Sequence, residues 1–185
     1  MKKSILLLLA TVLLLSCESN VKQRYTQQSP EIDIYKEVIK AYENQEWETL
    51  ASHYADTAKI MNNATEKDAQ NIAQLIAINK EDAALFSSWD YVEEEADYEM
   101  VITDEGRTWV NFWGLWQGTL KANNKMYEIP TSITAQFIDG KIVKEFGYWD
   151  VSNLHLDLQA LQNTNSTEDE SEMDGGTTSD GEGGQ

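Results

Sequence analysis

Aromatic and polar side chains alternate along the second half of this chain, with spacing that suits the binding of an organic molecule. Side chains two residues apart share one face of a strand, so Trp109 and Trp113 would lie on the same face. Large rings with a few polar groups bind small apolar or aromatic molecules. Such a face could equally belong to the core or to a contact with a second copy of the chain. The candidate ligand-binding residues are Trp109, Asn111, Trp113, Gln117, Phe146 and Tyr148.

Other reactive groups are sparse. The two histidines, His53 and His155, are isolated, and no Gly-rich phosphate loop or nucleophile elbow occurs, so neither a metal site nor a cofactor is predicted. The acidic run Glu93–Glu95, continued by Asp97 and Glu99, would place alternate carboxylates on one solvated face of a strand. Weak calcium binding is the alternative, although a flat strand makes a poor cage for the ion.

The first seventeen residues have the pattern of an export signal. Lys2 and Lys3 precede an apolar stretch at 5–15, which as a helix would rise about 16 Å and is too short to cross a bilayer. The segment Leu14-Leu15-Ser16-Cys17 resembles the lipobox of bacterial lipoproteins. That resemblance implies cleavage before Cys17 and acylation of its sulfur and new amine, which would anchor the protein durably to the cell envelope. The alternative is an ordinary secretory signal.

Removal of residues 1–16 would leave enough chain for one domain with its own core. The formal charge of −18 would become −20 without Lys2 and Lys3, and so acidic a surface repels nucleic acid. Residues 17–30 are polar and are predicted to be a tether that follows the lipidated cysteine. Residues 163–185 carry seven acidic side chains and no basic one, which predicts disorder. The folded domain is expected over residues 31–162.

This domain begins with helical spacing and continues with the period-two alternation of strands. Pro130 falls within one expected strand and requires an edge position or a bulge there. Helices first and a meander of long strands afterwards predict an α+β fold. Helices are expected at 30–42, 47–54, 65–87 and 154–161, and strands at 58–61, 89–103, 107–121, 125–138 and 141–151.

The end of the domain, together with this order of elements, resembles the SnoaL-like branch of the nuclear transport factor 2-like superfamily. The resemblance rests on Phe137-Ile138-Asp139-Gly140-Lys141-Ile142-Val143, followed by Glu145 and Tyr148-Trp149-Asp150. It implies a conical, barrel-like fold in which N-terminal helices pack in a curved antiparallel sheet around an apolar pocket. Members include polyketide cyclases, ketosteroid isomerases and binding modules without chemistry, so the fold does not by itself decide the function.

The resemblance also implies a role for Asp150. SnoaL-like cyclases use an aspartate at the end of the last strand as an acid or base, and an apolar pocket raises the pKa of a carboxyl group toward working pH. The alternative is that Asp150 caps the strand end. The cyclases pair this aspartate with a histidine on a neighbouring strand, and the expected long strands of this chain contain none.

These observations favour a membrane-tethered pocket protein that binds a small apolar or aromatic molecule without turnover. One alternative is an isomerase- or cyclase-type enzyme with Asp150 as general base and Tyr98 or Tyr148 as hydrogen-bond donor. Another is a homodimerising interaction module whose tryptophan-bearing sheet face contacts a second copy.

Overall fold

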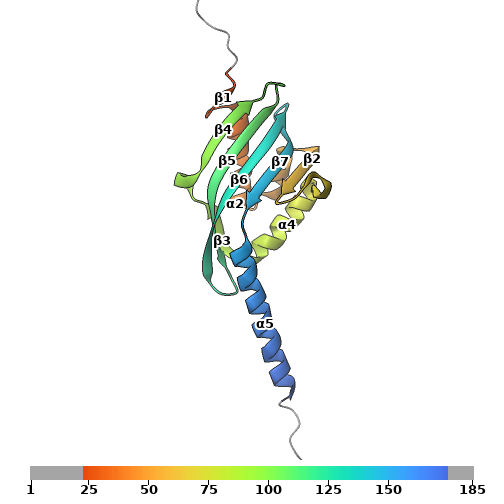
Figure 1. Cartoon of the computed structure of the whole chain (residues 1–185), viewed down its shortest axis with the longest axis vertical. Coiled ribbons are helices and arrows are strands. Elements are labelled where there is room, and N and C mark those ends of the chain that lie inside the picture. The colour runs from red at the N-terminus through yellow and green to blue at the C-terminus, as the bar shows by residue number, and fades with distance from the viewer. Residues whose placement is uncertain (1–22, 175–185) are drawn as a thin grey trace, which may run out of the picture.

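The computed structural model describes residues 23–174, with side chains described up to residue 163. It shows a strongly curved sheet that holds helices against one face (Figure 1), so the expected α+β, cone-like fold is confirmed. Single 3₁₀ turns lie at Glu66–Asp68 and Glu93–Glu95. The helices and strands are β1 (Tyr25–Thr26), α2 (Pro30–Glu43), α3 (Trp47–Ser52), β2 (Tyr54–Asn62), α4 (Ile72–Leu85), β3 (Phe86–Tyr91), β4 (Asp97–Ile102), β5 (Thr108–Leu120), β6 (Lys125–Ile138), β7 (Lys141–Trp149) and α5 (Ser152–Asp174).

The strands form one sheet in the order β1-β4-β5-β6-β7-β2, with β3 pairing with the other end of β5. The long strands β5, β6 and β7 are joined by short turns and pair antiparallel, as expected. Strand β2 instead pairs parallel with β7, so the sheet is mixed rather than wholly antiparallel. No tight turn joins β2 to β7, and the connection between them therefore does not impose an antiparallel direction.

Pro130 lies at a local edge, as its chemistry requires. It is opposite Leu115 of β5, but the pairing of β6 with β7 begins only at Thr131, opposite Trp149. At Pro130, strand β6 therefore has a neighbour on one side, and the missing proline N–H costs no bond to β7.

The acidic run interrupts the strand that was predicted over 89–103. Strands β3 and β4 both pair with β5, where Tyr91 lies opposite Trp116 and Asp97 opposite Trp113. Between them, Glu93–Glu95 form an exposed 3₁₀ turn. Extra residues opposite a shorter stretch of the partner bend a strand outward, and here the turn brings three like charges into water. The prediction that Glu93 and Glu95 share one strand face with Asp97 was therefore wrong.

Helix α4 begins at Ile72, later than the predicted start at residue 65. Asn71 and Gln74 form a capping box, in which each side chain bonds to the backbone N–H of the other residue. This satisfies two N–H groups that a helix start leaves without partners. The Thr65 hydroxyl instead donates a hydrogen bond to the Asp68 carboxylate, at the 3₁₀ turn Glu66–Asp68.

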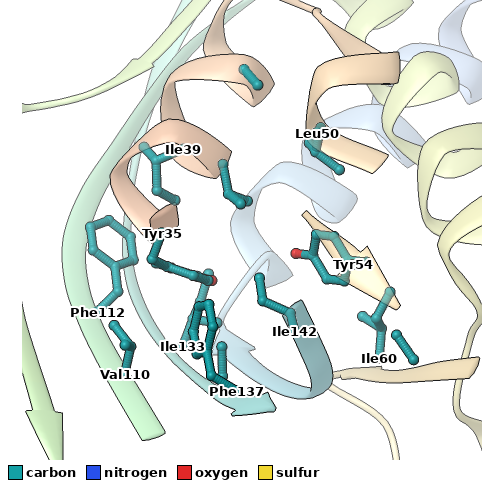
Figure 2. Close-up of a cluster of buried hydrophobic side chains, with 14 of the residues drawn as sticks. Tyr35, Ile39, Leu50, Tyr54, Ile60, Val110, Phe112, Ile133, Phe137 and Ile142 are labelled. Atoms are coloured by element: carbon teal, nitrogen blue, oxygen red, sulfur yellow. The ribbon is translucent and has the colours of Figure 1, made fainter. Parts of the chain in front are cut away.

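The core fills the space between the helices and the inner face of the sheet. Figure 2 shows Tyr35 and Ile39 of α2 beside Phe112 and Val110 of β5, with Leu50 and Tyr54 arriving from the opposite side. The side chains of 1% exposure or less include Ile32, Tyr35, Ile60, Met61, Val110, Phe112, Leu120 and Ile142.

The two ends of the described chain depart from the sequence-based expectation. Tyr25 and Thr26, within the predicted tether, pair with β4 as β1. Helix α5 continues past residue 161 to Asp174 and points away from the sheet (Figure 1), so part of the segment predicted to be disordered has helical backbone. Once nucleated, a helix gains one hydrogen bond per added residue, and this sequence contains no Gly or Pro between Ser152 and Gly175.

Residues 1–22, with Cys17, and 175–185 lie outside the described residues. In the described part, no helix is both long and apolar enough to span a membrane.

Candidate functional site

A cavity of about 460 Å³ lies between the inner face of the sheet and helices α2, α4 and α5. Its wall is largely apolar, with contributions from residues such as Val38, Leu75, Phe86, Ile133 and Leu154. This volume and lining are typical of sites that bind small organic molecules. The polar groups that reach the cavity therefore determine what it can recognise.

Glu145 of β7 lines this cavity, although it is only 4% exposed to solvent. The hydroxyls of Tyr35 and Tyr54 donate hydrogen bonds to its Oε2 atom over 3.1 and 2.8 Å. Burial raises the pKa of Glu145 from 4.5 to about 7, and the two tyrosine bonds oppose this rise. At neutral pH the carboxyl group is therefore balanced between its protonated and ionised forms.

Three separate elements position this group. Tyr35 comes from α2 and Tyr54 from the start of β2, while the parallel pairing places Ile60 opposite Glu145. Figure 2 shows the hydroxyls of Tyr35 and Tyr54 turned toward one another across the core. Burial raises the pKa of both tyrosines well above 10, so they remain neutral donors. Both bonds go to Oε2, and neither tyrosine occupies Oε1.

Further polar atoms in the cavity wall lack hydrogen-bond partners within the described part of the chain. They are Asn62 Oδ1, Gln70 Oε1 and Trp89 Nε1, each buried from water. Buried polar atoms are normally paired, and leaving one unpaired costs about 1–3 kcal/mol. These atoms are themselves covered but belong to residues that line the cavity, and a bound molecule toward which the side chains turn would complete their bonds.

Aromatic rings form the wall on the β3 and β5 side. Tyr42 of α2 lies 6.3 Å, between ring centroids, from both Trp89 and Tyr91. Trp116 donates its indole N–H to the Tyr42 hydroxyl over 3.2 Å, and burial raises the pKa of Tyr42 to about 12. These rings offer flat faces to an apolar or cationic ligand.

Asp150 does not point into the cavity, contrary to the expectation from the resemblance. It is exposed, and its Oδ1 accepts a hydrogen bond from the backbone N–H of Ser152 over 2.9 Å at the start of α5. Hydrogen bonding to the side chain and the backbone N–H of Ser152 lowers the pKa of Asp150. The proposed general base was therefore placed wrongly: β7 ends at Trp149, and Asp150 belongs to the turn into the helix, the capping role that was its alternative.

The six candidate ligand-binding residues lie away from the cavity. Along β5 and β7 the buried residues alternate with them, and none lines the cavity. Asn111 instead bonds to Glu99 and Thr134, and the rings of Trp109 and Phe146 stack 6.2 Å apart. The residues of this outer face are Trp109, Asn111, Trp113, Gln117, Phe146 and Tyr148.

Alternation along the sequence separates the two faces of the sheet correctly but does not tell which face the helices cover. The six predicted ligand-binding residues lie on the outer face, whereas the cavity lies on the face that the helices cover. Glu145 entered the sequence argument only as part of the resemblance. A usable signal was present: Glu145 shares its strand face with Gly147 and Trp149, and a single carboxylate on a face of that kind is a candidate for burial. Tyr98, offered as a donor, packs on Phe112 outside the cavity.

The histidines do not form a cluster. His155 lines the cavity near α5, whereas His53 follows α3 and faces Glu37 at 3.7 Å. Within residues 23–174, no group of three or more His, Cys, Asp or Glu side chains is arranged to hold a metal ion.

No protein-family model and no curated protein sequence matches this chain, but solved structures share its fold. A proposed polyketide cyclase from Xanthomonas campestris pv. campestris is 12% identical in sequence and superposes with a TM-score of 0.57. The match covers 70% of this chain and 96% of the cyclase chain. A proposed SnoaL-like polyketide cyclase from Shewanella denitrificans OS-217 is 17% identical, with coverages of 72% and 99% and a TM-score of 0.54.

A third structure is a protein with a ketosteroid isomerase-like fold from Catenulispora acidiphila DSM 44928, solved in complex with trimethylamine. It is 11% identical, with coverages of 65% and 87% and a TM-score of 0.52. At such identities the likeness establishes the fold alone. The fold is that of the nuclear transport factor 2-like and SnoaL-like proteins, as the sequence resemblance implied.

Proposed function

We propose that this protein binds a small, largely apolar organic molecule in the cavity beside Glu145 and releases it unchanged. The observation that carries the proposal is a carboxyl group buried in an apolar cavity and held by two tyrosines from other elements. Removing a carboxylate from water is costly, and the cost rises with burial. A glutamate retained at such a position is therefore a candidate for function rather than for stability.

The arrangement favours binding over turnover. Both tyrosine hydroxyls donate to Glu145 itself, so neither is directed at a place where a substrate oxygen would develop charge. This geometry fixes the carboxyl group as a rigid polar anchor for one end of a ligand, while the rings and aliphatic side chains contact the rest.

Native mass spectrometry of the full-length protein, purified from its own host under mild conditions, tests the proposal. Wild-type protein is expected to carry a bound molecule, Glu145→Gln to lose most of it, and Glu94→Gln, which changes an exposed glutamate, to retain it. Wild-type protein that carries nothing and binds none of a panel of apolar probes would contradict the proposal.

A second candidate is an isomerase-type enzyme in which Glu145 takes the proton. A carboxyl group with a pKa of about 7 in an apolar cavity is suited to general acid–base catalysis. Conversion of the retained molecule by the wild type, abolished in Glu145→Gln, would favour the enzyme over the binding protein.

We also propose that two copies pair through the outer face. Trp113 and Tyr148 are 42% and 55% exposed there, beside the stacked rings of Trp109 and Phe146. Apolar surface of this kind is typical of protein contacts. Trp113→Lys should convert a dimer to a monomer in sedimentation experiments, and Glu94→Lys should not. A wild-type monomer at high concentration would rule the pairing out.

A lipid on Cys17 would hold this domain at a membrane of the cell envelope. The proposal rests on the sequence of residues 1–17 alone, and loss of membrane association on replacement of Cys17 would support it.

A further inference from the structure

The charges of the cavity wall have one sign. Its acidic members are Glu145 and Asp82, and no lysine or arginine of the described residues lines it. Among these same residues, His155 is the one wall member that can become cationic, and it adjoins Asp82, whose pKa its charge lowers against the rise caused by burial. Glu145 itself is bonded only to uncharged tyrosines in the described structure. The buried carboxylate therefore has no counterion from this part of the protein.

The unpaired atoms nearest to Glu145 along the sheet are both acceptors. Asn62 lies opposite Gly147, two residues beyond Glu145 on β7, and Gln70 pairs with Ile60, the residue opposite Glu145. Asn62 and Gln70 therefore border the same corner of the cavity, and their side-chain oxygens are covered and lack donors within the described chain. An uncharged hydrocarbon would leave these oxygens unpaired, and an anion would be repelled by them. A group that donates several hydrogen bonds and carries positive charge matches the Glu145 carboxylate, and it would pair with the two amide oxygens if their side chains turn toward it.

The other side of the cavity suits the remainder of such a molecule. Trp89 lies on β3, opposite Gly118 of β5, and β5 and β6 lie between β3 and β7, the strand that carries Glu145. The rings of Tyr42, Trp89 and Tyr91 present faces that attract cations and apolar groups alike. Trp89 Nε1 is a buried donor without a partner in the described residues, and Trp89 belongs to the cavity wall; an oxygen on the distal part of a ligand would accept its bond if the ring turns toward it.

We infer that the ligand is an organic amine whose ammonium group pairs with Glu145 and donates hydrogen bonds to the side-chain oxygens of Asn62 and Gln70. Its apolar body lies against the rings of Tyr42, Trp89 and Tyr91. The inference rests on the proposed function, because it names the chemical class of the molecule that occupies this cavity. The protein then supplies the carboxylate and the ligand supplies the missing counterion.

Three probes with the same ring and different charge test the inference on the wild-type protein. They are cyclohexylamine, cyclohexanol and cyclohexanecarboxylate, compared by isothermal titration calorimetry at pH 8. We expect the amine to bind at least tenfold more tightly than the alcohol and the carboxylate not to bind. Equal affinity for amine and alcohol would overturn the inference and leave the pocket function standing. Binding of none of the three, with no molecule retained from the host, would overturn the proposed function itself.

Substitutions of the two acidic wall residues test which of them causes the preference for the amine. Glu145→Gln should abolish the tenfold advantage of the amine and keep the weak affinity for the alcohol, and Glu94→Gln should preserve both. Asp82→Asn tests the other acid of the wall and should reduce the preference much less than Glu145→Gln does. If Asp82→Asn removes the preference and Glu145→Gln does not, the assignment to Glu145 is wrong.

Proton release gives a second readout that a loss of packing would not change. The groups that face Glu145 are the neutral tyrosines Tyr35, Tyr54 and Tyr91, so an incoming ammonium group should displace a proton from Glu145 itself. Titrations at pH 7 in two buffers of different ionisation enthalpy should show release of a fraction of a proton in the wild type and none in Glu145→Gln. Asp82 and His155 also line the cavity, and Asp82→Asn measures their share. Binding of the amine with no proton release in the wild type would contradict the ion pair.

Discussion

At the scale of single residues, the two carboxyl groups near the end of the last strand behave in opposite ways although only five positions separate them. Glu145 is enclosed, and burial raises its pKa to about 7. Asp150 is exposed, and hydrogen bonding to the side chain and the backbone N–H of Ser152 lowers its pKa. Environment rather than residue type thus decides which carboxyl group can hold a proton at neutral pH.

The raised pKa of Glu145 predicts a particular dependence of stability on pH. A carboxyl group with a folded-state pKa of about 7 and an ordinary value of 4.5 binds more protons in the folded state between these two values. The free energy of unfolding should therefore fall as pH rises from about 4.5 to about 7, with a contribution of about 3 kcal/mol from this one group. Urea denaturation of wild type and Glu145→Gln across this range checks it: the difference between the variants should change with pH in that window. Parallel curves would show that Glu145 titrates normally.

The exposed position of Asp150 predicts that its charge does not affect the cavity. Asp150→Asn should leave ligand retention in native mass spectrometry unchanged, while its effect on the melting temperature stays small because an asparagine oxygen can still accept the Ser152 bond. Glu145→Gln is the matched substitution, with the same chemical change inside the cavity. A loss of ligand in Asp150→Asn as large as in Glu145→Gln would restore Asp150 to the site.

At the scale of elements, strand β5 places aromatic rings on its inner face by a simple alternation with glycines. Phe112, Gly114, Trp116 and Gly118 follow one another on its inner face, and the rings lie over the glycines. A Cβ atom on Gly118 would come within 2.1 Å of the Trp116 ring, and one on Gly114 within 2.5 Å of Phe112. The glycines therefore provide the room that the Phe112 and Trp116 rings occupy, and Trp116 is the one of the two that lines the cavity.

Gly118→Ala should displace the Trp116 ring and destabilise the domain by roughly 1–3 kcal/mol, the usual cost of overpacking. Trp116 donates to Tyr42, so the substitution should also alter the aromatic wall and weaken ligand binding. Thr119→Ala, at the next position of the same strand, should cost less, because its side chain is not on the inner face. Chemical denaturation and calorimetry measure both effects. Equal stability of the two variants would show that Trp116 can move without cost.

At the scale of the whole molecule, the described chain begins beside β1 and ends on α5, at opposite ends of the sheet (Figure 1). The cavity is lined by α4 and α5 residues such as Ala83 and Leu158. A protein anchored through its N-terminal segment would therefore carry α5 on the side away from the membrane. Such an arrangement would leave the cavity accessible to a ligand from the aqueous phase.

Cys17→Ser should release the protein from the membrane fraction without changing its melting temperature, because the expected attachment site precedes the domain expected over residues 31–162. Detergent partitioning and fractionation of wild type and variant measure this. Ser16→Ala provides a control, since a small residue still precedes the cysteine, and it should remain in the membrane fraction. Retention of Cys17→Ser in that fraction would refute lipid anchoring at this residue.

The sequence by itself determined the class of fold and the positions of most elements, because helical and period-two spacings are local properties. The bounds of β5 and β6 agree with those predicted to within one residue, and Pro130 correctly marked an edge. Only the tertiary structure decided which face of the sheet the helices cover, that β2 pairs parallel with β7, and that Tyr35 and Tyr54 meet at Glu145. Alternation along a strand assigns two faces without assigning their surroundings, and partners 110 and 91 residues apart in the chain leave no local pattern. The aromatic residues and the aspartate that stood out in the sequence therefore belong to the outer face and a helix start, whereas the cavity is built around a glutamate that only burial distinguishes.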